Sequence, residues 1–327
     1  MIEPYRPQLN DKVFVAGSSG LVGSTIVESL KARGFDNIIT STSKNLDLTD
    51  AHKVSSFLGD HKVQIVIDAA AKVGGIWANM NYPADFIYLN TQIQNNLIHH
   101  SYLQGVKKFV FLATSCIYPR ESAQPIKEEY LLTGPLESTN HAYAVAKIAG
   151  IEMIRSYREQ YGVDYITLNP TNLFGPNDNF SLKTGHAVPA MIHRMHDAKE
   201  KKLGHIEIWG SGKACREFMY CPDAAEAIVF LMENYSENEM INVGTGIDHS
   251  IKEIAQTVQT IVGFKGELRF DTSKPEGMPR KLLDCGKLHQ QGWKAPHSLK
   301  EGVEKAYKWF LENQDQVNDK IKRHDNG

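Results

Sequence analysis

Short apolar runs alternate with longer stretches of helical periodicity through the first half of the chain. The apolar runs are rich in β-branched and aromatic residues, as buried strands are, and they cover residues 12–16, 35–40, 64–69, 108–113 and 165–169. Helical stretches lie between or after them, notably residues 24–33, 84–104 and 143–161. This alternation predicts right-handed crossover connections and a parallel sheet with helices on both faces, which is an α/β fold.

A glycine-rich turn separates the first predicted strand from the first predicted helix. Its sequence is Gly17-Ser-Ser-Gly20-Leu-Val-Gly23. In a dinucleotide-binding turn, Gly17 would permit the tight bend, Gly20 would let the backbone approach a pyrophosphate, and Gly23 would let helix and strand pack closely. The spacing departs from the simple G-x-G-x-x-G pattern, and a glycine cluster can also be an ordinary turn. The order of strand, glycine turn and helix nevertheless favours a dinucleotide site.

The alternation loosens after about Asn172, where Gly, Pro and charged residues become more frequent. We therefore predict a Rossmann-type doubly wound parallel sheet with a smaller C-terminal substrate-binding domain. The cofactor domain would comprise residues 1–172 and 217–235, with a return to the sheet near residues 218–232. The substrate domain would comprise residues 173–216 and 236–327. Residues 313–327 are polar and charged, and we expect them to fray.

Composition narrows the class of protein. The chain has 327 residues, 42% of them hydrophobic, which is enough for a large core. Its formal charge of −2 gives no electrostatic reason to expect binding to nucleic acid or to a membrane surface. No window approaches the ~18 consecutive apolar residues that a membrane span needs, and the N-terminus lacks the layout of a signal peptide. We therefore expect a cytoplasmic protein.

The cysteines point to neither a metal site nor a disulfide framework. They are scattered and lack metal-ligand spacing; the four are Cys116, Cys215, Cys221 and Cys285. A single cysteine can still be catalytic.

Two residues in the third helical stretch carry candidate chemistry. Tyr143 and Lys147 are four residues apart, so a helix places them on one face. A neighbouring cation favours the phenolate, and such a pair makes an acid/base that can work near neutral pH. The same spacing also occurs by chance on solvated helix faces, so the assignment depends on the rest of the chain.

The fourth predicted strand ends in Thr114-Ser-Cys-Ile-Tyr-Pro119. Ligands bind at the carboxyl ends of strands in such folds. A hydroxyl here, from Thr114 or Ser115, can hydrogen-bond a substrate oxygen from the side opposite the Tyr143 phenol. The sequence does not decide between the two hydroxyls.

These features together resemble an extended short-chain dehydrogenase/reductase that acts on a nucleotide sugar. Longer motifs, at residues 114–119, 169–180, 185–190 and 208–212, resemble the GDP-L-fucose synthase family, and the resemblance extends from Lys12 to about Trp309. It implies NADPH-dependent conversion of GDP-4-keto-6-deoxy-D-mannose to GDP-L-fucose, by epimerisation at carbons 3 and 5 and reduction at carbon 4. It also implies a homodimer formed through the helices at residues 84–104 and 143–161.

The resemblance assigns roles to individual residues. Cys116 and His186 would remove and return protons during epimerisation. Tyr143 would donate a proton during reduction, and Lys147 would hold the nicotinamide ribose. Thr114 stands where many relatives have serine. From the residues alone, Cys116 also fits a buried small hydrophobe, and His186 a loop histidine bonded to backbone.

NADP(H) is the expected cofactor, because the second predicted strand ends in Thr40-Ser-Thr-Ser-Lys44 without the acid that binds NAD ribose hydroxyls. Ser41 and Lys44 are the candidates for the 2′-phosphate, although Lys44 can also be an ordinary surface lysine. The resemblance adds further cofactor contacts. They are Gly17, Ser18, Ser19, Gly20, Leu21, Val22, Gly23, Asp47, Leu48, Ala70, Ala71, Val73, Asn90, Pro170, Thr171, Asn172, Leu173 and His186, besides Tyr143 and Lys147.

For the GDP end of the substrate, the resemblance points to a set of charged and aromatic residues. They are Arg194, Trp209, Arg216, Glu276 and Lys281. An arginine fork suits a diphosphate because it donates two parallel bonds.

Two other functions stay open. One is reduction of a different GDP-4-keto sugar, such as a GDP-heptose, with little or no epimerisation. The other is a non-catalytic, cofactor-sensing regulator. Tyr143 and Lys147 speak against a regulator, because a binding module has no need of a proton donor.

Overall fold

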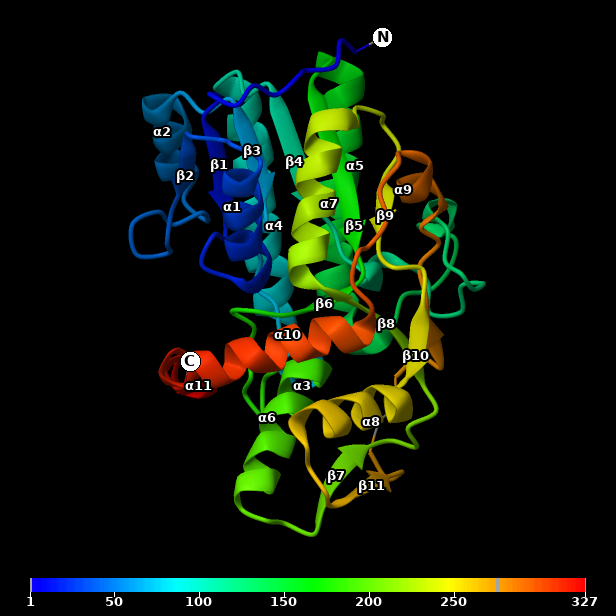
Figure 1. Cartoon of the computed structure of the whole chain (residues 1–327). Helices are drawn as coiled ribbons and strands as arrows, with labels where there is room; N and C mark the ends of the chain where they lie inside the picture. The colour runs from blue at the N-terminus through cyan, green and yellow to red at the C-terminus, as the bar shows by residue number, and fades with distance from the viewer. Residues whose placement is uncertain (1, 275–276, 327) are drawn as a thin grey trace.

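A six-stranded parallel sheet forms the larger part of the molecule (Figure 1). Its strand order is β2-β1-β3-β4-β5-β9 in the computed structural model, which describes residues 2–274 and 277–326. The strands are β1 (Val13–Ala16), β2 (Ile38–Thr40), β3 (Ile65–Asp68), β4 (Lys108–Leu112), β5 (Asp164–Pro170) and β9 (Ile241–Val243). The predicted α/β fold with a parallel sheet is thus confirmed. β2 begins later than predicted because the Phe35 N–H still bonds the Leu30 carbonyl at the end of the preceding helix.

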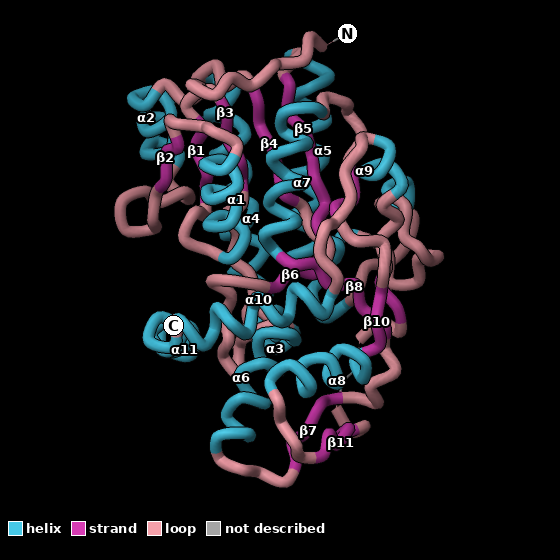
Figure 2. The backbone as a smooth tube through the Cα atoms, viewed as in Figure 1, coloured by secondary structure: helices cyan, strands magenta, loops and turns pink. Residues whose placement is uncertain are grey.

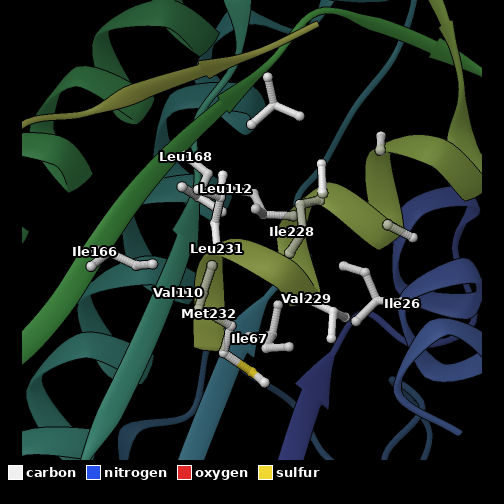
Figure 3. Packing of buried hydrophobic residues seen from close by; sticks show 14 of the residues in the cluster. Ile26, Ile67, Val110, Leu112, Ile166, Leu168, Ile228, Val229, Leu231 and Met232 are labelled. Carbon is white, nitrogen blue, oxygen red and sulfur yellow. The ribbon is translucent and has the colours of Figure 1, made fainter. Parts of the chain in front are cut away.

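Helices cover both faces of this sheet. These helices are α1 (Leu21–Ala32), α2 (Ala51–His61), α4 (Pro83–Leu103), α5 (His141–Tyr161) and α7 (Cys221–Asn234). The short helix α3 (Ile76–Asn81) packs against α4 instead. Side chains of β1 alternate between two buried clusters, Val13 and Val15 on one face and Phe14 and Ala16 on the other. Strands buried on both faces read as continuous apolar runs, which is why the sequence reveals them. Figure 3 shows the first cluster, where α7 packs against β3, β4 and β5.

A smaller part lies beyond the carboxyl ends of these strands (Figure 2). Its strands are β6 (Asn172–Phe174), β7 (His205–Trp209), β8 (Cys215–Tyr220), β10 (Asp248–Ser250), β11 (Glu267–Asp271) and β12 (Arg280–Lys281). Its longer helices are α6 (Ala187–Glu200), α8 (Ile251–Val262) and α10 (Leu299–Glu312). β8 pairs with β6, β10 and β12, and β7 pairs with β11. A third buried cluster holds these elements together.

The boundary between the two parts differs from the sequence prediction at two places. Strand β9, which was assigned to the substrate domain, is the sixth strand of the large sheet. The predicted return near residues 218–232 is helix α7, which packs on the large sheet, whereas β8 belongs to the smaller sheet. Both strands pair only with segments that are distant in sequence, so the local pattern does not reveal which sheet they join.

The C-terminal stretch is helical rather than frayed. Helix α11 (Gln314–Asn326) buries Val317, and its Gln316 and Lys320 side chains donate to the Asn177 side chain and backbone at 2.7 and 3.0 Å. The prediction of fraying was therefore wrong, because these tertiary contacts stabilise a polar helix. Short helical segments complete the chain; they are η1 (Ser115–Ile117), η2 (Glu128–Tyr130), η3 (Ser138–Asn140) and α9 (Gly286–Gln290). Among the described residues, no helix has the length and apolar character needed to cross a membrane.

Candidate active site

The glycine turn between β1 and α1 forms a cradle that admits no side chains at two positions. A Cβ on Gly17, whose φ is 76°, would lie 2.6 Å from the Ala69 carbonyl oxygen. A Cβ on Gly23 would lie 2.2 Å from the Gly17 oxygen. Gly20 has open space, with its nearest neighbour at 3.4 Å, so an incoming group can approach its backbone.

This cradle fits a dinucleotide. Gly20 is the N-cap of α1, and within the described chain no side chain caps that helix end. Its free N–H groups and positive dipole end suit a pyrophosphate. The neighbouring loop supports the cradle, since the Ser18 hydroxyl donates to the Ser41 carbonyl at 3.1 Å. Helix α1 begins at Leu21, three residues earlier than predicted, so Leu21 and Val22 lie in its first turn.

The loop after β2 leaves a cation free for a phosphate. Lys44 is exposed, whereas Ser41 is buried. Asp47 is exposed as well, but its carboxylate accepts from the Thr49 N–H and hydroxyl, and these bonds lower its pKa. The Asp47 carboxylate is therefore bound within its own turn, and Lys44 is the group that could bind a 2′-phosphate.

Asn90 supports the site rather than facing it. Its side chain bonds the backbone N–H and carbonyl of Lys72, at 2.9 and 3.0 Å, and the Phe86 carbonyl. These bonds hold the loop after β3, which carries Ala70, Ala71 and Val73. In the same way, the Thr171 and Asn172 side chains donate to the Glu217 carbonyl, which fixes the turn between Pro170 and Leu173.

The end of β4 presents one hydroxyl and one thiol. Thr114 is the N-cap of η1, and it and Cys116 are partly exposed. Ser115 is only 4% exposed. Of the two candidate hydroxyls, Thr114 is thus the one that can reach a substrate.

Tyr143 on α5 lies beside this strand end, edge-on to the Phe86 ring. Burial raises the pKa of the phenol well above its ordinary value, and the nearby Cys116 and Asp68 raise it further. A hydrogen bond with the Thr114 hydroxyl offsets part of this rise. Burial, Cys116, Thr114 and Asp68 account for the pKa shift of this phenol, so stabilisation of the phenolate by Lys147 stays a prediction.

Lys147 points into the sheet. Its ammonium donates to the Leu112 carbonyl at 2.9 Å and lies 4.6 Å from the centre of the Phe111 ring. Burial lowers the pKa of Lys147, and the carboxylate of Asp68 partly restores it. Asp68 is fully buried at the end of β3, and burial raises its own pKa to about 6.

His186 is the N-cap of α6, and its side chain is 43% exposed. Its Nδ1 lies 3.8 Å from Oδ1 of Asp178, a carboxylate that is 3% exposed. This carboxylate raises the pKa of His186 and outweighs burial, which lowers it. The histidine is therefore paired with a side chain rather than with backbone.

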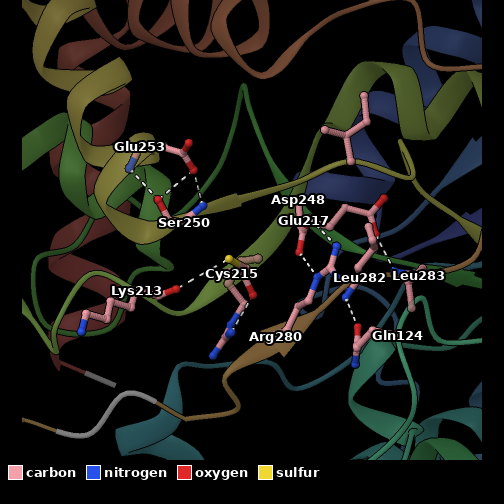
Figure 4. A network of polar contacts seen from close by, with 12 residues as sticks. Gln124, Lys213, Cys215, Glu217, Asp248, Ser250, Glu253, Arg280, Leu282 and Leu283 are labelled. Atoms are coloured by element: carbon pink, nitrogen blue, oxygen red, sulfur yellow. Dashed lines mark hydrogen bonds and ion pairs between the residues drawn. The ribbon is translucent and has the colours of Figure 1, made fainter.

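Lys281 lies next to the thiol. Its ammonium is 3.4 Å from the Cys116 sulfur. The flanking residues are anchored, since Arg280 binds both carboxylate oxygens of Asp248 and the Leu282 N–H donates to Gln124 (Figure 4). The structure thus brings Lys281, which the resemblance assigns to the GDP end, next to the epimerisation candidate Cys116.

Of the other predicted GDP contacts, Arg216 is the cross-strand partner of Lys281. Arg194 donates to the Glu207 carbonyl at 2.7 Å, and burial lowers its pKa. Trp209 is 61% exposed, with the Lys274 ammonium 5.9 Å from its ring centre. Arg216 donates to the Cys215 carbonyl. Glu276 lies outside the described residues.

Sequence reasoning missed three charged residues at this site, Asp68, Asp178 and Lys274. The first two follow strands β3 and β6, so inspection of every strand end for acids could have found them. Lys274 follows a strand of the small sheet and had no local signal. Within residues 2–274 and 277–326, no group of three or more His, Cys, Asp or Glu side chains is arranged for a metal ion, and the four cysteines are free.

Known proteins share both the sequence and the fold. Residues 13–244 match the NAD dependent epimerase/dehydratase family. The GDP-L-fucose synthase of Sinorhizobium fredii is 51% identical over 302 residues, which is 92% of this chain and 96% of that one.

Two solved structures are similar over almost their whole length. A GDP-L-fucose synthetase from Naegleria fowleri bound to NADP has a TM-score of 0.89 at 31% identity, covering 96% of this chain and 97% of that one. A GDP-mannoheptose C4 reductase from Campylobacter jejuni with NADP bound has a TM-score of 0.85 at 41% identity, covering 93% and 99%. This chain therefore belongs to the NAD dependent epimerase/dehydratase family, in the branch that includes the GDP-L-fucose synthases.

Proposed function

We propose that this protein is an NADPH-dependent epimerase and reductase that converts GDP-4-keto-6-deoxy-D-mannose to GDP-L-fucose. The observation that carries the proposal is the cluster at the end of β4. Thr114, Cys116 and Tyr143 lie close together there, and the Lys281 ammonium is 3.4 Å from the Cys116 sulfur. A reductase alone needs the hydroxyl and the phenol. A thiol with a cation beside it suits proton removal next to a ketone, which supports retained epimerisation.

Epimerisation needs a base on one face of the sugar and an acid on the other. The Cys116 thiolate would take the proton from carbon 3 or carbon 5, and the electron pair would move to the C4 oxygen as an enolate. His186, held as imidazolium, would return a proton to the opposite face. Both groups are partly exposed, so exchange with water can reset them between the two carbons.

Reduction of the C4 ketone needs a proton donor and a held oxygen. Bound NADPH would supply the hydride. Tyr143 would donate its proton to the C4 oxygen, and the Thr114 hydroxyl would hold that oxygen. A raised phenol pKa suits this role, since the group must be protonated at the start of the step. Lys147, tied to Leu112, would orient the ribose.

NADP(H) fits the residues around the cradle. The Gly17–Gly23 turn admits a pyrophosphate, and Lys44 is the exposed cation after β2. We assign the remaining family contacts around the adenine and nicotinamide to the same cofactor. Asn90, Thr171 and Asn172 would act through the backbone that they hold.

A C4 reductase of another GDP-4-keto sugar is the second candidate. The similarity to the Campylobacter GDP-mannoheptose C4 reductase, at 41% identity, favours it specifically. The two functions differ in one chemical respect. Only the epimerase must exchange the hydrogens on carbons 3 and 5 with solvent.

One experiment separates these functions. The protein is incubated with NADPH in D₂O and either GDP-4-keto-6-deoxy-D-mannose or a GDP-4-keto-heptose, and the product is analysed by NMR. GDP-L-fucose with deuterium at carbons 3 and 5 is the expected result. Reduction without exchange would overturn the epimerase and support the sister reductase. Binding of NADPH without turnover of either sugar would support the regulator.

Replacing the thiol tests the division of labour. Cys116→Ser should still oxidise NADPH but yield a product that lacks deuterium at both carbons, because a hydroxyl is a far poorer base than a thiolate. Cys215→Ser, which changes another partly exposed cysteine, is the control and should behave like wild type. Normal deuterated GDP-L-fucose from Cys116→Ser would show that Cys116 only packs.

We further propose a homodimer formed through α4 and α5, located in the cytosol. The two helices have 21 residues each and pack along one another. The outer face of α5 carries exposed small residues, Ala149 and Ser156, which suit close approach of a second copy. Four free cysteines agree with a reducing compartment.

A further inference from the structure

The catalytic candidate His186 stands at a helix end that opposes its charge. It is the N-cap of α6, a helix of 14 residues. The N-terminus of a helix carries a partial positive charge, which disfavours a cation there. An imidazolium at this position therefore needs a compensating anion if it is to act as an acid near neutral pH.

Asp178 supplies that anion from a buried position. Its Oδ1 lies 3.8 Å from Nδ1 of His186, and the carboxylate is 3% exposed. Oδ1 also accepts from the Asn179 N–H at 2.7 Å, which fixes the carboxylate. Oδ2 is buried and has no hydrogen-bond partner among the described residues. A buried carboxylate with an unsatisfied oxygen is costly unless a charge nearby compensates it.

Local packing brings the two residues together. The loop between them folds back on itself, because the Gly185 N–H donates to the Ser181 carbonyl at 3.0 Å. A Cβ on Gly185 would lie 2.4 Å from that oxygen and 2.5 Å from the Asn179 oxygen. Only glycine permits this closure, which returns the chain to Asp178 just before His186.

Both ends of the loop are tied to other elements. The backbone oxygen of Asn177 accepts from Lys320 of α11 at 3.0 Å, and its side chain donates to Ser24 of α1 at 3.3 Å. On the other side, the Phe180 ring stacks near Trp309 of α10, and its carbonyl bonds His193 of α6. These anchors hold Asp178 in place, while the His186 side chain stays exposed.

We propose that Asp178 is a positioning residue that orients His186 and holds it as imidazolium, so that His186 can return protons during epimerisation. Only the return of protons by His186 rests on the proposed function, whereas the pairing of His186 with Asp178 does not. The other titratable and charged groups nearby are the Cys221 thiol on α7, the Lys183 ammonium over the Trp77 ring, and Lys320. None of them supplies a second anion. The separation of 3.8 Å exceeds a direct hydrogen bond and would shorten when the substrate closes the site.

The first test needs no substrate. NMR titration of His186 in ¹³C-histidine-labelled protein, assigned with His186→Gln, should give a pKa in Asp178→Asn that is about one unit below wild type, as loss of an adjacent opposite charge requires. Asp178→Glu should restore much of the shift. An unchanged titration in Asp178→Asn would overturn the proposal whatever reaction the protein catalyses.

The chain offers a matched control. Asp223 on α7 is equally buried, and it binds Nδ1 of a different histidine, His297, at 2.7 Å. Asp223→Asn should alter the titration of His297 and leave that of His186 unchanged. If both variants shift His186 alike, a general loosening of the fold explains the effect and the proposal fails.

The second test measures epimerisation as deuterium exchange into the substrate. In D₂O, Asp178→Asn should slow deuterium entry at carbons 3 and 5 by tenfold or more, as misplacement of a catalytic group does, and the loss should ease below neutral pH. The Asp178→Asn change should have no further effect in a His186→Gln background. Equal losses in both backgrounds would show a structural role. Absence of exchange in wild type would instead contradict the proposed function and leave the titration result standing.

Discussion

At the carboxyl end of β4, the phenol of Tyr143 lies in a setting that keeps it protonated. Burial and two acidic neighbours, Cys116 and Asp68, raise its pKa, and the Thr114 hydroxyl offsets this only in part. The Lys147 ammonium is directed to the Leu112 carbonyl instead. Tyr143 is thus prepared to give a proton rather than to take one.

Tyr143→Phe removes the proton donor and leaves the ring packing intact. We expect NADPH to bind as in wild type and turnover to fall 10²–10⁴-fold, as removal of a positioned acid does. Stopped-flow measurement of NADPH oxidation checks this, with Tyr161→Phe on the molecular surface as the control. Turnover at the wild-type rate would exclude Tyr143 as the donor.

Asp68 makes the stability of the fold depend on pH. Burial raises its pKa to about 6 from 3.8, so the folded state favours the protonated carboxyl. The stability from this group is complete below about pH 4 and is lost as the pH rises through 6, a loss of up to roughly 3 kcal/mol.

Asp68→Asn is neutral at every pH and escapes this loss. Relative to wild type, the free energy of unfolding of the variant should rise between pH 4 and pH 7, as measured by urea titration at each pH. Asp36→Asn, at an exposed carboxylate, should show no such trend. A difference between Asp68→Asn and wild type that is constant with pH would contradict the assignment.

The loop after β2 is the element that we propose selects the cofactor. Its two carboxylates are engaged locally, Asp47 with Thr49 and Asp50 with the Lys53 N–H, and Lys44 is exposed. Lys44 is therefore the charged group that we propose for the 2′-phosphate.

Lys44→Glu should narrow or reverse a preference for NADPH over NADH, because like charges repel. The ratio of kcat/KM for the two cofactors measures this, and Lys107→Glu, at the amino edge of the sheet, is the control. A wild-type enzyme that prefers NADH would refute the prediction outright.

Elements with strong local signals could be predicted from the sequence, and others could not. The strands from β1 to β5 and helices α4 and α5 have continuous apolar runs or long periodicity. β9 has three residues and α11 is mostly polar, so tertiary contacts decide both. At the site, motifs located Thr114, Cys116 and Tyr143. The groups that contact them come from chain segments far apart in sequence, as Lys281 does in its contact with Cys116.

At the scale of the whole molecule, the proposed dimer is open to a direct test. Ala149 is exposed on the outer face of α5, so a glutamate there should leave the isolated chain folded. In a dimer it would place a charge in the interface, which is costly. Sedimentation should show Ala149→Glu near 36.7 kDa and wild type near twice that mass. Ala51→Glu on α2 should remain dimeric, and a monomeric wild type would contradict the interface.

The order of strands along the chain bears on how such an enzyme can acquire a new substrate. The chain leaves the large sheet after β5, returns with α7 and β9, and leaves again before β10. Neither part is a continuous stretch of sequence, so a single recombination event cannot exchange the smaller part, which we propose binds the sugar, for that of a relative. A grafted chimera would need several matched junctions at once. Changes of sugar specificity should therefore arise by point substitutions around fixed catalytic groups, and directed evolution by random mutagenesis should outperform segment shuffling on this scaffold.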